Sequence, residues 1–307
     1  MRFIITFSLT VLITCILFTK ADACLWTAGE PQVGKRFQID GLNANDFAKK
    51  FVTHENRAYW EKLKTEIEEQ KKSHSFMEIR NNLAVALIHL GNVSEAIKIL
   101  EELEKNKPGE YFTATNLGTA YELNGENEKA LIWIKEGIKR NKDSHFGTEW
   151  LHVKILEAKL AIQKDSNWLK NNSVLGANFN DSRNNSADKI SITDQDGQKK
   201  SMAEIEEALV YQLHERLEFV KPPEPIVADL LFDLNKIFSV TRTPEHAKVV
   251  KELSVKYGAN SEFALRYSES ERVNVEEKKH FYLIIAAIIA FLLIAGIYIF
   301  KRKRIAN

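Results

Sequence analysis

The sequence predicts an all-α protein: a solenoid of antiparallel helix hairpins followed by a single C-terminal transmembrane helix. Three observations predict this class. A 34-residue segment recurs with the same internal spacing. The whole chain contains only 6 Pro and 13 Gly, the two residues that most disfavour helix interiors. Residues 281–300 form an apolar run without a charged side chain.

Residues 77–110 and 111–144 are the two copies of the repeat. When they are aligned, seven positions are identical. The identical pairs are Asn82/Asn116, Leu83/Leu117, Ala86/Ala120, Gly91/Gly125, Ala96/Ala130, Glu102/Glu136 and Lys105/Lys139. Such a period predicts a supersecondary unit that stacks on its neighbours.

Each copy has the pattern of two antiparallel helices. Ala84 and Gly118 are small residues that let the helices of a pair approach closely. Gly91 and Gly125 fall at the predicted turn, where glycine can adopt the left-handed conformation that ends a helix.

This pattern resembles the tetratricopeptide repeat (TPR) of bacterial proteins. The strings "CLW" from Cys24, "DSHFG" from Asp143 and "PPEPIVADLL" from Pro222 are further similar to an exported, membrane-anchored subgroup. The resemblance implies no established activity and no cofactor. It implies a scaffold that binds segments of other proteins in a concave groove lined by the first helix of each pair.

Single repeats cannot bury their apolar faces alone, so we expect helices on both sides of the two copies. Residues 24–76 are predicted to form N-terminal capping helices. Residues 145–163 are predicted to form a terminal helix that closes the TPR region, 77–163. In that helix Leu151 and Ile155 lie 34 residues after Leu117 and Tyr121, and Lys159 stands where the turn glycine would recur.

The remainder of the exported part divides by composition. Residues 164–202 are rich in Asn, Asp, Ser and Gly, which predicts a polar linker. Residues 203–260 contain two segments with Pro at an early helical position, which predicts a degenerate helical hairpin. Residues 261–280 are charged and are expected to form a stalk.

The two ends predict export and anchoring. Residues 1–23 have the pattern of a signal peptide, with an uncleaved anchor as the alternative. Cleavage would leave Cys24 first, although the residues before it match a lipoprotein signal poorly. Residues 281–300 have the length of a membrane span, and the basic tail 301–307 is expected in the cytoplasm. We therefore expect a single-pass protein of the bacterial inner membrane with most of the chain outside.

The composition argues against a nucleic-acid partner and against an internal disulfide. With 43 Lys and Arg against 42 Asp and Glu, the chain has no overall positive charge that would attract nucleic acid. Cys15 would leave with the signal peptide, so the mature chain could form no internal disulfide.

The candidate partner-binding groove lies on the first helices of the two copies. Its predicted residues are Asn81, Asn82, Val85, Thr115, Asn116 and Thr119. Asn82 and Asn116 recur although helix packing does not require an amide there, and an amide can both donate to and accept from a peptide backbone. The alternative is that these amides bridge the loops of adjacent repeats.

No familiar catalytic motif is present. The sequence lacks GxSxG, GxxxxGK[ST], GxGxxG and HExxH patterns. His214-Glu215 is half of a metal motif, and His145 and His152 could meet on one helix face without a third ligand. We therefore expect no metal, no cofactor and no catalysis. The alternative is an envelope hydrolase or other enzyme with an unrecognised site in residues 171–220.

Overall fold

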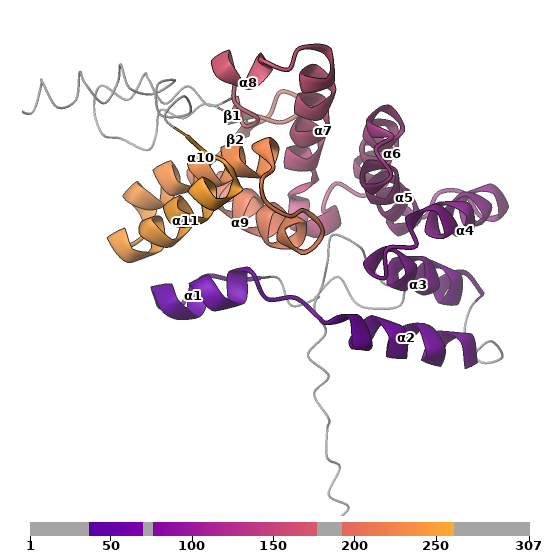
Figure 1. Cartoon of the computed structure of the whole chain (residues 1–307). Helices are drawn as coiled ribbons and strands as arrows, with labels where there is room; N and C mark the ends of the chain where they lie inside the picture. Colours follow the sequence, from indigo (N-terminus) through magenta and orange to yellow (C-terminus); the bar gives the residue numbers. More distant parts are fainter. Residues whose placement is uncertain (1–36, 70–75, 177–191, 261–307) are drawn as a thin grey trace, which may run out of the picture.

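A computed structural model of the chain describes residues 37–69, 76–176 and 192–260 (Figure 1). These residues are mostly helical and include one two-stranded hairpin, so the all-α class is confirmed. In chain order the elements are α1 (Ala44–Phe51), α2 (Arg57–Glu69), α3 (Phe76–His89), α4 (Val93–Asn106), α5 (Tyr111–Leu123), α6 (Asn127–Arg140), the 3₁₀ helix η1 (Ser144–Gly147), α7 (Glu149–Lys164), α8 (Trp168–Asn171), β1 (Ile192–Thr193), β2 (Lys199–Lys200), α9 (Met202–Phe219), α10 (Pro225–Thr241) and α11 (Pro244–Tyr257).

Helices α2 to α7 pack in sequence order, each against the next (Figure 1). The turns after α3 and α5 have the predicted form. Gly91 has φ 86° and Gly125 has φ 82°, both left-handed. After α3, the backbone amide of Asn92 donates to the Leu87 carbonyl at 2.8 Å. After α5, the backbone amide of Glu126 donates to the Tyr121 carbonyl at 2.9 Å. These bonds satisfy carbonyls that the helix end leaves open.

The small residues lie where the helices of a pair meet. A Cβ added to Gly118 of α5 would lie 2.6 Å from Cδ1 of Ile134 in α6. A Cβ on Gly137 of α6 would lie 2.4 Å from Cγ2 of Thr115 in α5. Both distances are too short for carbon atoms, so glycine at each position allows the close approach of the two helices.

Two apolar clusters form the core, and α7 contributes to both. The first cluster lies among α2 to α6, and Val153 and Leu156 of α7 belong to it. The second lies among α1 and α9 to α11, and Leu151 and Ile155 of α7 belong to that one. Helix α7 therefore packs against both the repeats and the C-terminal helices.

The C-terminal part begins at well-defined helix starts. Ser201 and Glu204 form a reciprocal capping box at the start of α9. Pro225 and Pro244 open α10 and α11, as predicted, and α11 ends at Gly258 with φ 114°. The predicted hairpin corresponds to α10 and α11, and α9 is an additional helix in the same range.

The N-terminal helices differ from the expectation that residues 24–76 cap the repeats. Helix α2 does pack on α3. Helix α1 instead packs on α11, because Phe47 and Phe51 are fully buried in the second cluster. Helix α1 therefore belongs to the C-terminal core.

The described part of the segment expected as a polar linker, 164–202, has secondary structure. It contains α8 and the hairpin of β1 and β2, in which Ile192 pairs with Lys200. Val174, Leu175 and Ile192 are buried in the second cluster. These apolar residues, scattered among polar ones, attach the segment to the core.

Among residues 37–69, 76–176 and 192–260, no helix combines the length and the apolar character that a bilayer crossing needs. The predicted signal peptide 1–23, stalk 261–280, transmembrane helix 281–300 and tail 301–307 lie outside the described residues.

Replacement of Gly118 by Leu tests the close approach of α5 and α6. The new side chain would meet Ile134, so we expect a loss of about 1–3 kcal/mol in unfolding free energy, typical of overpacking. Urea denaturation of Gly118→Leu measures it. Ile132→Leu, on the exposed face of α6, is the control. An unchanged midpoint for Gly118→Leu would contradict the packing.

Candidate functional site

Most of the predicted groove residues are buried. Asn81, Val85, Thr115 and Asn116 have no exposed surface, and Thr119 is 6% exposed. Asn82, on α3, is the one of the six that is half-buried rather than buried. An incoming peptide could therefore reach Asn82 directly but not the other five side chains.

The asparagine amides bond to one another. Asn116 Nδ2 of α5 donates to Asn81 Oδ1 of α3 at 3.0 Å, and Asn81 Nδ2 lies 3.4 Å from Asn82 Oδ1. Asn116, one of the two recurring asparagines, thus links α5 to α3 through Asn81, the neighbour of the other. This bond joins two helices and not two loops.

A second polar group, the junction cluster, lies where α5, α7 and α9 meet. It consists of Glu122, His145, Glu149, His152, Lys159 and Arg216. All except Lys159 are buried. The two histidines that the sequence predicted on one helix face lie on different elements, His145 on η1 and His152 on α7, and both contact Glu149. Its carboxylate bonds to His145 Nδ1 and lies 3.2 Å from His152 Nδ1.

Glu122, near the end of α5, is the centre of the junction cluster. Its carboxylate accepts from Arg216 Nη1 at 2.6 Å and from Nη2 at 3.2 Å. His152 Nε2 lies 2.6 Å from Oε2, and Lys159 Nζ lies 2.7 Å from Oε1. One carboxylate therefore holds α7 and α9 to α5.

The electrostatics of the junction cluster follow from burial and from these partners. Burial raises the pKa of Glu122, but Arg216, Lys159 and His152 outweigh it and hold the pKa well below its usual range. Burial likewise opposes ionisation of Glu149, and His145 and His152 lower its pKa. Burial lowers the pKa of His152, but Glu149 and Glu122 raise it overall. Each buried charge of the cluster is therefore offset by neighbouring charges of opposite sign.

The turn before α7 is strained at the junction cluster. His145 has φ 50° and Phe146 has φ 58°, a left-handed conformation that costs about 1–3 kcal/mol for a residue with a side chain. The Thr148 hydroxyl donates to the His145 carbonyl at 2.7 Å, and Gln212 Nε2 of α9 donates to Thr148 Oγ1 at 3.2 Å. Contacts from α7 and α9 thus hold the turn.

Helix α9 also reaches the end of α3. Glu218 Oε1 lies 2.6 Å from His89 Nδ1, and Phe219 packs on the same ring with centroids 5.0 Å apart. The His89 ring stacks on Trp60 of α2 at 3.5 Å. Burial lowers the pKa of His89 more than Glu218 raises it, so the neutral ring is favoured. Helix α9 therefore contacts the C-terminal ends of both first helices, α3 and α5.

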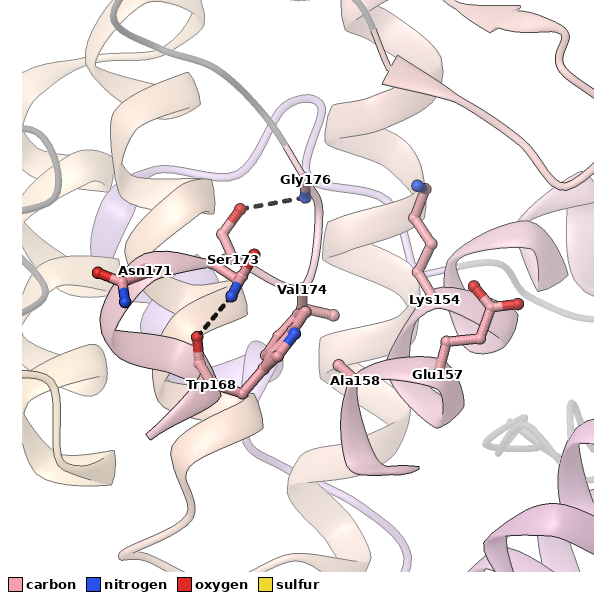
Figure 2. Close-up of a pocket in the computed structure, with 9 residues that line it drawn as sticks. Lys154, Glu157, Ala158, Trp168, Asn171, Ser173, Val174 and Gly176 are labelled. Atoms are coloured by element: carbon pink, nitrogen blue, oxygen red, sulfur yellow. Dashed lines mark hydrogen bonds between the residues drawn. The ribbon is translucent and has the colours of Figure 1, made fainter. Parts of the chain in front are cut away.

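A cavity of about 390 Å³ lies beside α7 and α8 (Figure 2). Its lining residues are Lys154, Glu157, Ala158, Trp168, Asn171, Asn172, Ser173, Val174 and Gly176. Part of this lining, residues 171–176, falls in the range 171–220 that the enzyme alternative named. Among the described residues, no group of three or more His, Cys, Asp or Glu side chains could hold a metal ion.

Sequence reasoning missed the residues that complete the junction cluster: Glu122, Glu149 and Arg216. One signal was present, because Glu149 is four residues after His145 and three before His152, a spacing that would place all three on one face of a continuous helix. Arg216 carried no such signal, since its partner Glu122 is 94 residues away.

Comparison of the chain with known protein families, with curated proteins and with solved structures returns no match.

Replacement of Arg216 by Met tests the junction cluster. It leaves Glu122 buried with only part of its compensating charge, so we expect a loss of about 3 kcal/mol in unfolding free energy. Lys248→Met is the matched control, because its pair with Glu252 is exposed and 3.8 Å long, and we expect a change within about 0.5 kcal/mol. Equal effects of the two substitutions in urea denaturation would rule out a structural role for the cluster.

His214 predicts a loss of stability in acid. Burial lowers its pKa to about 4, against the smaller opposing effect of its bond to the Phe51 carbonyl. The folded chain therefore favours neutral His214, so its contribution is complete above pH 6.5 and is lost as pH falls from 6.5 towards 4, by up to roughly 3 kcal/mol. His214→Gln should flatten this part of the curve of unfolding free energy against pH. A wild-type slope in the variant would contradict the assignment.

Proposed function

We propose that the chain is a TPR scaffold that binds a segment of another protein against the first helices of its helix pairs. The observation that carries this proposal is the agreement of two consecutive pairs, α3 with α4 and α5 with α6, in packing and in turn geometry. Both pairs have left-handed glycine turns, and both bury a small residue, Ala84 or Gly118, at the same position of the first helix. Stacked pairs of this kind form a solenoid whose first helices share one face.

The contacts of α9 restrict where the partner binds. They cover the C-terminal ends of α3 and α5, through His89 and Glu122. The half-exposed residues in the N-terminal halves of the two first helices include Ile79, Asn82 and Phe112. We therefore assign the partner surface to these N-terminal halves. It presents apolar side chains and one amide beside the charged Glu78 and Arg80, which suits a segment that carries some apolar residues.

The proposed scaffold is anchored in the membrane. The sequence supports this part of the proposal, through the apolar run 281–300 and the basic tail that follows it. In this arrangement the helical region lies outside the bacterial inner membrane and recruits other envelope proteins. No catalysis and no cofactor are required for that role.

Site-specific photo-crosslinking tests the partner surface. A photoreactive amino acid at Asn82 should crosslink to a distinct protein in host cells, whereas the same amino acid at Ile132, exposed on α6, should not. The surface assignment predicts that Phe112→Glu removes the adduct and leaves the far-ultraviolet circular dichroism spectrum unchanged. Equal crosslinking from both positions, or none from Asn82, would exclude this partner surface.

A further inference from the structure

The cavity beside α7 and α8 has walls of two kinds (Figure 2). Ala158 and Val174 are buried and Trp168 is half-buried, so together they form an apolar wall. Lys154 and Glu157 project from α7 next to them. The volume, about 390 Å³, is in the lower part of the range for pockets that bind small molecules. It suits a body about as large as a tripeptide or a disaccharide.

Lys154 is the charged group that sets the chemistry of the cavity. It is half-buried, and burial lowers its pKa more than Glu157 and Asp194 raise it. Both of these carboxylates are paired with other lysines: Glu157 with Lys135 at 3.0 Å, and Asp194 with Lys200 at 2.9 Å. Within the described part of the chain, neither carboxylate pairs with Lys154. Glu157 and Asp194 therefore stabilise the Lys154 ammonium group only from a distance, and a bound anion in direct contact would offset more of the cost of its burial.

Hydrogen-bond donors lie near this lysine. Ser173 Oγ accepts from the Gly176 amide at 3.0 Å, which leaves its hydroxyl hydrogen to donate. Asn172 Nδ2 donates to the Trp168 carbonyl at 2.8 Å. Asn171 is exposed at the same rim. The cavity thus offers the Lys154 ammonium group, the Ser173 hydroxyl, the Asn171 amide and an apolar wall, beside the Glu157 carboxylate that pairs with Lys135.

We propose that this cavity binds a small ligand with one carboxylate, which Lys154 holds while the body of the ligand rests on Trp168, Ala158 and Val174. A single ammonium group without a direct ion pair matches a ligand with one negative charge better than it matches a doubly charged phosphate. The apolar wall and the volume require a ligand with a body, not a bare anion. A short peptide with a free carboxyl end and a sugar acid both have this chemistry. The site is separate from the partner surface on α3 and α5, so the result of testing one proposal does not affect the other.

Titration calorimetry on the purified full-length chain in detergent tests the proposal with matched pairs of probes. The first pair is N-acetyl-alanyl-alanine and its carboxy-terminal amide. The second is glucuronic acid and glucose. We expect at least one acid to bind, and its neutral counterpart to bind at least about tenfold more weakly. The pair that responds identifies the source of the carboxylate. No binding by either acid, or equal binding by an acid and its neutral counterpart, would overturn the proposal.

Variants place the binding at this cavity. Lys154→Gln should weaken binding of the acid at least about tenfold, and Asn171→Ala, at an exposed position, about threefold. Lys248→Gln, on α11 and outside the cavity lining, should bind as the wild type does. If Lys154→Gln fails to fold by circular dichroism, Asn171→Ala and the acid–neutral comparison decide the outcome. Wild-type affinity in a folded Lys154→Gln would place the ligand elsewhere and refute the assignment.

Discussion

The packing of the structure depends on α7, a helix whose side chains contribute to two apolar cores. Val153 and Leu156 pack into the cluster of the repeats, and Leu151 and Ile155 pack into the cluster of the C-terminal helices. A surface helix needs one apolar stripe, but a helix between two cores needs two. Polar residues on α7 are therefore confined to the narrow seams between the stripes. His152 lies in one such seam, which explains why a charged network is buried there.

That network has a geometric role. Apolar contacts alone tolerate small rotations of one helix on another, whereas buried charges are favourable only in the arrangement that pairs them. Glu122 meets Arg216, Lys159 and His152 together only when α5, α7 and α9 hold one mutual position. The strain at His145 and Phe146 is consistent with this constraint, because the turn adopts the backbone conformation that delivers His145 to Glu149.

Local features of the fold could be predicted from the sequence, whereas long-range contacts could not. The turn glycines, the Gly118 contact and the helix-start prolines each depend on interactions within a few residues or within one repeat. The packing of α1 on α11 and the pair of Glu122 with Arg216 depend on residues far apart in the chain, for which one sequence carries no periodic signal. The spacing of Leu151 and Ile155 after Leu117 and Tyr121 predicts a terminal helix, and these residues lie on α7. The structure shows that these side chains turn to the C-terminal core instead of a second helix of their own pair. For the candidate site, the sequence found the recurring asparagines, but it could not show that Asn81 and Asn116 satisfy each other.

The packing of α1 on α11 has a consequence for the order in which the protein acquires its structure. Contacts within α2 to α7 join segments that are close in sequence, so they can form as soon as those residues are available. Helix α1 differs, because Phe47 and Phe51 are buried against α11, which is synthesised much later. Until α11 is available, these two aromatic side chains lack their burial partners. The chain must therefore keep α1 from aggregating during that interval.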